Sequence, residues 1–272
     1  MLKLCTILFL FYMTSVDART LLVVDSDLHS SLPKHFRILE KNNLKAIASG
    51  QFSPTQLQNI LKKIHAPIVI IDLRQESHGF INDIPVSWYG VKNHANKGKT
   101  SAAIAKDEEN LLNVLALSEI TLHQIIKKEQ GHIIETRPLT VKPQKADEEK
   151  TLAKRLGIPY YRFYLADHSF PSEKQIKRLK GLLQNIPKGT WVYFHCRGGS
   201  GRSSTFLLLY DIFLNAKNES LDDMVDEHVR MGSKDLSKLP AVENYKYNLA
   251  QKRWEVIKKI YITMTTNNTF PN

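Results

Sequence analysis

The stretch His195-Cys196-Arg197-Gly198-Gly199-Ser200-Gly201-Arg202-Ser203-Ser204 decides the fold of this 272-residue chain. Residues 191–194, which precede it, have high β-propensity and predict a buried parallel strand. The apolar run 205–214 that follows is too long for a strand and predicts a buried helix. In a glycine-rich turn between a strand and a helix, free backbone N–H groups and the positive end of the helix dipole point toward the same place. The turn is therefore predicted to bind an anion such as a phosphoryl group.

Two side chains convert this anion site into a reactive one. The helix dipole and Arg202 favour the thiolate of Cys196, which is the nucleophilic form. The planar guanidinium of Arg202 can hold two phosphoryl oxygens, and Ser203 can donate a hydrogen bond to the departing sulfur. The spacing Cys-x5-Arg after a histidine is typical of cysteine-dependent phosphatases. The alternative is a buried structural thiol in an ordinary turn, but the flanking strand and helix favour the phosphatase.

A general acid is expected upstream of this turn. Residues 160–165 predict a strand, and Ser172 with Gln175 predicts a capping box that starts the next helix. Asp167 lies on the loop between them, where it can protonate a leaving alcohol oxygen. The alternative is that Asp167 only shapes this turn.

The remaining periodicity predicts an α/β chain. Helices are expected from Ser53 onwards and at 106–126, 147–156, 220–231 and 240–263, and strands at 21–24, 67–72 and 84–90. Asp72 and Arg74 follow the strand 67–72, at the edge where open α/β sheets bind ligands. The alternative for both is an internal ion pair that braces the sheet.

The start of the chain predicts export. Lys3, the apolar run 4–13 and small residues up to Ala18 are typical of a signal peptide at residues 1–18, which leaves residues 19–272 in the periplasm or outside the cell. Cys5 leaves with this peptide, so Cys196 has no disulfide partner.

Composition limits the partners of the chain. The net charge of +11 favours a polyanionic partner, while no nucleic-acid-binding motif is present. No Cys/His cluster indicates a metal, and no later segment is apolar for long enough to insert stably in a membrane.

Several stretches of the sequence resemble the protein-tyrosine-phosphatase-like inositol polyphosphate phosphatases, the bacterial cysteine phytases. The resemblance covers most of residues 19–272 and is most specific at Asp72-Leu73-Arg74-Gln75-Glu76-Ser77-His78-Gly79 and Pro85-Val86-Ser87-Trp88-Tyr89-Gly90. The other matching stretches are 32–37, 52–59, 167–168 and the turn after Phe194.

The resemblance implies a cysteine-phosphatase fold, with a central, mostly parallel sheet flanked by helices and a small partial β-barrel at about residues 80–145. It implies hydrolysis of myo-inositol hexakisphosphate and lower inositol phosphates through a phosphocysteine, with no cofactor and no obligate protein partner. It makes Cys196 the nucleophile, Arg202 the phosphoryl ligand and Asp167 the general acid. The residues expected to bind substrate, from the turn or from the resemblance, are His195, Arg197, Gly198, Gly199, Ser200, Gly201, Ser203, His168, Asp72, Arg37, Lys246 and Arg253.

One departure keeps other substrates open. Members of the family often carry Glu after the nucleophile, whereas this chain has Arg197, which bears on the order of phosphate removal. The alternatives are a phosphoinositide or protein-tyrosine phosphatase, and a non-catalytic inositol phosphate sensor. Cys196, Arg202 and Asp167 together argue against the sensor, because a binder needs neither a nucleophile nor an acid.

Overall fold

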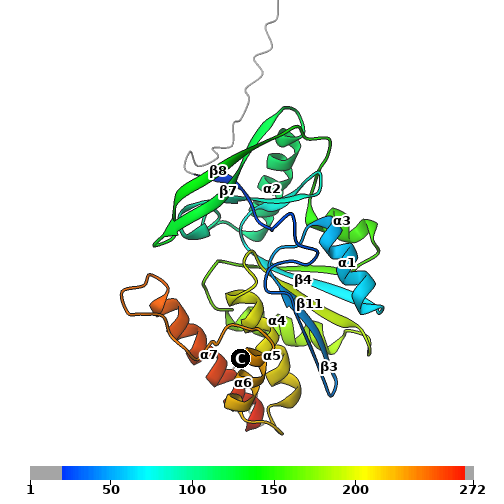
Figure 1. Ribbon diagram of the computed structural model, residues 1–272. Coiled ribbons are helices and arrows are strands. Elements are labelled where there is room, and N and C mark those ends of the chain that lie inside the picture. Colours follow the sequence, from blue (N-terminus) through cyan, green and yellow to red (C-terminus); the bar gives the residue numbers. More distant parts are fainter. Residues whose placement is uncertain (1–19, 267–272) are drawn as a thin grey trace, which may run out of the picture.

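A five-stranded sheet forms the centre of the protein in the computed structural model, which describes residues 20–266 (Figure 1). The strand order is β10-β4-β11-β3-β2. Their bounds are β10 (Tyr160–Leu165), β4 (Ile68–Arg74), β11 (Trp191–His195), β3 (Leu44–Ser49) and β2 (Arg37–Lys41). All neighbours are parallel except β2, which pairs antiparallel with β3 at the edge, so the predicted mostly parallel sheet is confirmed. The predicted signal peptide lies outside the described residues.

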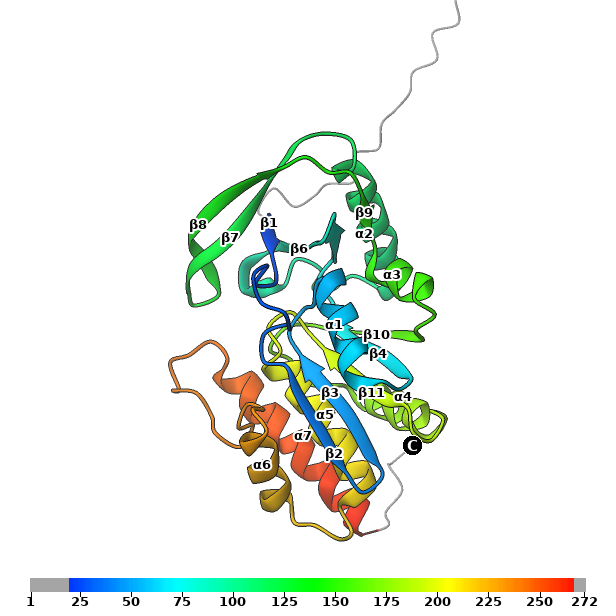
Figure 2. The ribbon, with the colours of Figure 1, turned by 45° about the vertical axis from the view of Figure 1, so that its right-hand side comes forward.

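Helices cover both faces of this sheet. Successive residues of a strand point to opposite faces, so Ile47 joins one core and Ala46 and Ala48 join the other. The first core contains side chains of α1 (Pro54–Ile64) and α3 (Glu149–Arg155), and the second contains side chains of α4 (Glu173–Gln184), α5 (Gly201–Asn215), α6 (Leu221–Arg230) and α7 (Tyr247–Thr265). In Figure 2, α1 lies across the sheet from α5, α6 and α7. None of the described helices is both long and apolar enough to cross a bilayer.

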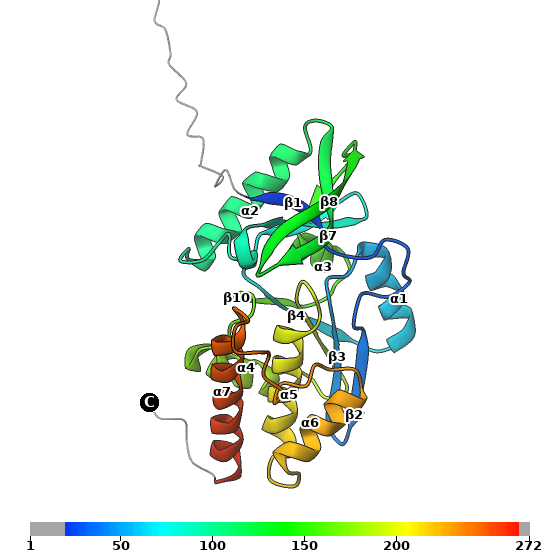
Figure 3. The same cartoon turned by 60° about the vertical axis from the view of Figure 1, so that its left-hand side comes forward.

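A second sheet lies at the carboxyl ends of the central strands, as Figure 3 shows from another side. Its order is β8-β7-β1-β6-β5-β9, for β8 (His132–Val141), β7 (Ile120–Glu129), β1 (Leu21–Val24), β6 (Ile84–Tyr89), β5 (His78–Ile81) and β9 (Ala146–Asp147). Helix α2 (Ser101–Leu115) packs Leu112 into a third core beneath it. Besides strands within 80–145, this sheet takes β1 from the start of the chain. The pairings of the described strands do not close it, so the partial barrel is not confirmed.

The predicted helix starts are confirmed by their caps. Ser53 and Ser172 both accept a hydrogen bond from the backbone of the third helical residue, a glutamine whose side chain binds the cap in return. Ser220 caps α6 in the same way through the backbone N–H of Asp223. These starts are readable from the sequence because each cap is local.

Two predicted helices are wrong in extent. The helix expected at 106–126 ends at Leu115, and Ile120 begins strand β7, which pairs in a hairpin with the following strand β8. The helix expected at 240–263 begins only at Tyr247, because the Asn244 side chain accepts from the N–H of Lys246 and closes a turn there. Both errors arise where a tertiary contact or a turn overrides helical spacing.

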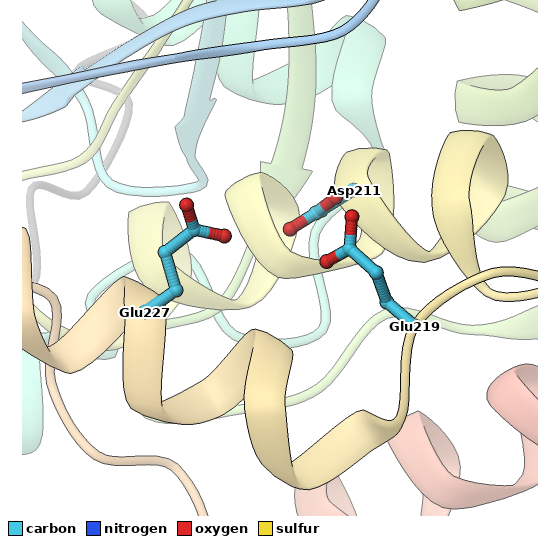
Figure 4. A group of neighbouring side chains, drawn as sticks. All are labelled: Asp211, Glu219 and Glu227. Atoms are coloured by element: carbon cyan, nitrogen blue, oxygen red, sulfur yellow. The ribbon is translucent and has the colours of Figure 1, made fainter.

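Three carboxylates fasten the edge hairpin β2–β3 to the helices. Asp211 on α5 lies near Glu219 and Glu227 from the α6 region, as Figure 4 shows. They are the described acidic group with the spacing to hold a metal, but Lys41 Nζ lies 2.9 Å from Asp211 and 2.7 Å from Glu219. The Lys41 ammonium therefore occupies the position that a metal ion would take between these carboxylates. Burial opposes ionisation of Asp211, yet His228 and Lys41 keep the pKa of Asp211 below its usual value.

Replacement of Lys41 by Met should destabilise the protein by about 3 kcal/mol, because Asp211 would keep its charge in a fully buried position. Urea unfolding of the full chain measures this loss. The matched control is Lys99→Met, which removes an exposed pair with Asp107 and should change stability by less than about 1 kcal/mol. Equal losses in the two variants would contradict the structural role of Lys41.

Candidate active site

The loop between β11 and α5 lies where the central strands end. We call residues 196–202 the cradle. Segments that leave the carboxyl ends of β3, β4 and β10 surround it, as expected for a site in a parallel sheet. Gly50, just beyond β3, forms a bridge with Gly198, and the N–H of Gln51 donates to the carbonyl of Arg197 at 3.1 Å. The cradle is thus held along its outer side by backbone contacts.

Gly199 is the residue that permits this close approach. Its φ of +73° lies in the left-handed region, and a Cβ built there would stand 2.2 Å from the backbone nitrogen of Gly50. Any other residue would push the cradle away from the end of β3.

Cys196 lies at the floor of the cradle and is 3% exposed. Its Sγ accepts a hydrogen bond from the N–H of Gly199 at 3.2 Å, and the Oγ of Ser203 lies 3.8 Å away. No side chain caps α5, so the amides of its first turn stay available to an anion above the sulfur. The thiol and the anion-binding amides therefore share one small space.

Arg202 is fixed from below by Glu76. Its two terminal nitrogens donate to the two carboxylate oxygens of Glu76 at 2.7 and 2.8 Å, and one also donates to the carbonyl of Leu165. Glu76 also accepts from Arg74. Burial opposes ionisation of Glu76, but Arg202 and Arg74 hold its pKa well below the usual value. Arg202 thus has one well-defined orientation, with its Nε buried and without a partner among residues 20–266.

Asp167 lies beside Arg202 on the loop after β10. Its Oδ1 is 3.3 Å from the Arg202 guanidinium, and its side chain is 21% exposed. The side chain of Asn93 donates to Oδ2, and the ring of His94 donates to the carbonyl of Asp167. Burial works against ionisation, yet Arg202 lowers the pKa of Asp167 to about 2. In the unliganded protein Asp167 is therefore a carboxylate.

Three further predicted residues meet at the rim. Arg253 on α7 donates to the carbonyl of His168 at 2.6 Å and lies close to Gly201. The ring of His168 is hydrogen-bonded to the hydroxyl of Tyr245 at 3.1 Å. Burial, aided by Lys246 and other cations, lowers the pKa of His168 to about 4, so this histidine is neutral at pH 7. Lys246, at the start of α7, is half-buried beside the same tyrosine.

Three predicted binding residues lie behind the cradle instead of on a pocket wall. Asp72 is fully buried, accepts a hydrogen bond from the hydroxyl of Tyr160 and forms an ion pair with Arg162, which is the internal ion pair that the sequence left open as the alternative. His195 is fully buried against Glu149, with 2.7 Å between Nε2 and the carboxylate.

Arg37 is the third of them and is 4% exposed. It donates to the carbonyl of Gly199 and to the hydroxyl of Ser204 at 2.9 Å. It therefore supports the cradle from beneath.

No role was predicted from the sequence for Glu76, Asn93 or Asp25, although each contacts a predicted site residue. Glu76 lies within the motif 72–79, so the resemblance pointed to this segment but assigned no function to Glu76. Asn93 is at φ +62° in a short turn, and Asp25 follows β1, 172 positions from its partner Arg197. Neither Asn93 nor Asp25 lies in a local sequence pattern from which its contact with the site could have been predicted.

Comparisons with known proteins agree on one family. The model of the PTP-like phytase family matches residues 71–214; the description of this family model reads "Inositol hexakisphosphate". A PTP-like myo-inositol phosphatase from Mitsuokella multacida, solved with myo-inositol-(1,3,4,5)-tetrakisphosphate, matches with 27% identity and a TM-score of 0.81 over 91% of this chain and 46% of that chain. A PTP-like phytase from Bdellovibrio bacteriovorus matches with 29% identity and a TM-score of 0.74, covering 91% of this chain and 89% of that chain.

A curated relative is also longer than this chain. Effector protein hopD2 of Pseudomonas syringae pv. tomato is 25% identical over 171 residues, which are 61% of this chain and 36% of that protein. The chain therefore spans about a third of the Pseudomonas protein and less than half of the Mitsuokella one.

Gly199→Ala should destabilise the protein by at least about 2 kcal/mol, because alanine would adopt a left-handed conformation and overlap Gly50. The neighbouring Gly198→Ala is the matched control, since a Cβ there meets nothing within 4 Å. Urea unfolding curves compare the two variants. Equal stability of both would show that the cradle does not depend on this close approach.

Proposed function

The chain belongs to the PTP-like phytase family, and on this premise we propose that it is a cysteine-dependent phosphatase that hydrolyses myo-inositol hexakisphosphate and lower inositol phosphates. The observation that carries the proposal is the meeting of Cys196, Arg202 and Asp167 around one cradle, with Arg202 at 3.3 Å from Asp167. A nucleophile, a phosphoryl ligand and an acid are the three groups that phosphomonoester hydrolysis needs.

Unsatisfied donors support an anionic substrate. The Nε atoms of Arg202 and Arg253 are buried and have no hydrogen-bond partner in the described part of the chain. Buried donors without acceptors are costly, and a phosphoryl group would supply the missing oxygens. The first amides of α5 add donors at the same place.

In the first step, Cys196 Sγ attacks phosphorus and the bond from phosphorus to the inositol oxygen breaks. The electron pair of that bond goes to the oxygen, which takes a proton from Asp167 and leaves as an alcohol. Arg202, held by Glu76, binds the equatorial oxygens as charge spreads over them. The product is a phosphocysteine.

In the second step, Asp167 accepts a proton from a water molecule whose oxygen attacks phosphorus. The bond between phosphorus and sulfur breaks, so Cys196 becomes a thiolate again and inorganic phosphate is released. Ser203, with its Oγ 3.8 Å from Sγ, can donate to the departing sulfur. Both half-reactions thus use Cys196 and Asp167, with the roles of each reversed in the second step.

A polyphosphorylated substrate also accounts for how Asp167 becomes protonated. In the free protein Arg202 keeps Asp167 charged, so the acid form must be produced by substrate binding. A bound polyanion engages Arg202 and adds negative charge, and both effects raise the pKa of a neighbouring carboxylate. We infer that substrate binding itself protonates the general acid.

Cys196→Ser should abolish phosphate release from inositol hexakisphosphate while the unfolding midpoint stays near that of the parent protein. The hydroxyl of serine is a far weaker nucleophile, because it is not ionised at neutral pH. Phosphate release is measured in parallel from inositol hexakisphosphate, a soluble phosphoinositide headgroup and a phosphotyrosyl peptide. Undiminished turnover in the variant would contradict the role of Cys196 as nucleophile. Faster turnover of the peptide by the parent protein would favour a protein-tyrosine phosphatase.

Asp167→Asn should lower kcat for inositol hexakisphosphate by roughly 10²–10⁴-fold, because the alkoxide would leave without a proton. The parent enzyme should work best at mildly acidic pH, since activity needs protonated Asp167 and is lost as pH rises through the pKa of the complex. The pH–rate profiles of both proteins test this.

p-Nitrophenyl phosphate provides the control for Asp167, because nitrophenolate leaves readily as an anion. The loss in the Asn variant should be much smaller with this ester. Equal losses with both substrates, or an alkaline optimum of the parent, would contradict the role of Asp167 as acid.

A further inference from the structure

Arg37, the first residue of β2, is a buried cation whose hydrogen bonds all go to neutral groups. Its Nε donates to the hydroxyl of Ser233 at 2.8 Å. One terminal nitrogen donates to the carbonyls of His35 and Gly199, and the other donates to the hydroxyl of Ser204. No carboxylate among residues 20–266 lies within ion-pair distance of this guanidinium. Its donors are therefore satisfied, but its charge is not balanced by an acidic side chain.

This lack of a carboxylate distinguishes Arg37 from other buried arginines of the protein. Arg74, Arg162 and Arg202 each form an ion pair with a carboxylate, at 2.8, 3.0 and 2.7 Å. A buried charge is costly unless another charge balances it. Burial lowers the pKa of Arg37 to about 10, so this side chain stays charged at pH 7, and the negative charge of Cys196 acts against the lowering. The thiolate is thus the charge that can balance Arg37.

Two groups connect Arg37 to the sulfur. The carbonyl of Gly199 accepts from Arg37 at 2.9 Å, while the N–H of the same glycine donates to Cys196 Sγ at 3.2 Å. The Oγ of Ser203 lies 3.4 Å from an Arg37 nitrogen and 3.8 Å from Sγ. Because an arginine can only donate, the Ser203 oxygen accepts from it, and the hydroxyl hydrogen stays free for the sulfur. Arg37 therefore orients and polarises both groups that donate to the thiolate.

The other charged and titratable side chains that face the sulfur come from three further elements. Arg202 lies on α5, Arg253 on α7 and Tyr193 on β11. Burial raises the pKa of Tyr193, so its hydroxyl is neutral, and Arg202 is paired with Glu76. Arg202 and Arg253 each keep a buried Nε without a partner in the described chain, available to a phosphoryl group. Every nitrogen of Arg37 already donates behind the cradle, so a substrate would leave Arg37 beside the sulfur.

We propose that Arg37 is a positioning residue that stabilises the thiolate of Cys196 from behind the cradle, acting through Gly199 and Ser203. It touches no substrate. In the first half-reaction it keeps the sulfur in its nucleophilic form, and in the second it favours return of the electron pair of the phosphorus–sulfur bond to the sulfur. The inference rests on the proposed function, and it gives Arg37 a different role from the substrate contact that the resemblance implied.

The test follows alkylation of Cys196 by iodoacetamide, an uncharged reagent, from acidic to mildly alkaline pH. The full chain is used, and mass spectrometry of the peptide that carries Cys196 gives the rate. Arg37→Gln keeps an amide donor but removes the charge, so half-maximal alkylation should occur about one pH unit higher than in the parent protein. Arg37→Lys keeps the charge and should stay close to the parent. Ser233→Ala, which removes one hydrogen bond of Arg37 and no charge, is the matched control and should match the parent.

Urea unfolding shows which variants are folded, and Arg37→Met provides a second neutral variant that should shift like Arg37→Gln. A folded neutral variant with the parent midpoint would overturn the role of Arg37. A shift of about one pH unit in Arg37→Lys would overturn it as well, because geometry and not charge would then be the cause. Alkylation involves no phosphate ester. These midpoints therefore decide the role of Arg37 even if the parent releases no phosphate from inositol hexakisphosphate and the proposed function fails.

Discussion

The buried ion pair between Glu76 and Arg202 is the contact on which the rest of the site depends. Both side chains are withdrawn from water, so neither can leave without exposing the other as an unpaired buried charge. The pairing continues from Glu76 to Arg74, from Arg74 to Asp25 and from Asp25 to Arg197. This chain of alternating charges begins and ends in the cradle. The geometry around the thiol is therefore fixed by charge balance at both ends of one loop.

This network explains why the second sheet is part of the site. Asp25 directly follows β1 in the sequence, and Glu76 lies between β4 of the central sheet and β5 of the second sheet. Asn93, from the turn after β6, donates to both Glu76 and Asp167. Separation of the two sheets would break all these contacts at once. The central sheet supplies Cys196 and the helix that follows it, and the second sheet orients the charges around them.

Electrostatics prepare this site for an anion with several charges. Burial, aided by nearby cations, lowers the pKa of His168 and keeps it neutral, while Arg202 outweighs burial and keeps Asp167 ionised. A substrate with one phosphoryl group balances only part of that field. On the proposed function, a polyphosphate would meet the cradle and the cations at its rim together, and its binding would be coupled to protonation of Asp167.

Strands β2 and β3 had no local pattern that predicted them, and the pairing of the central strands joins distant parts of the chain. The sequence by itself determined three of the central strands, the capped helix starts and the loop around Cys196, because each has a pattern within a few residues. It also marked Asp167, whose place after a strand is local. Only the tertiary structure decided which charged residues lie around the cradle and which are buried behind it. Glu76 is 126 positions from Arg202, and buried Asp72 has the same sequence context as an exposed ligand would. Partners so far apart leave no periodic trace, since only folding brings them together.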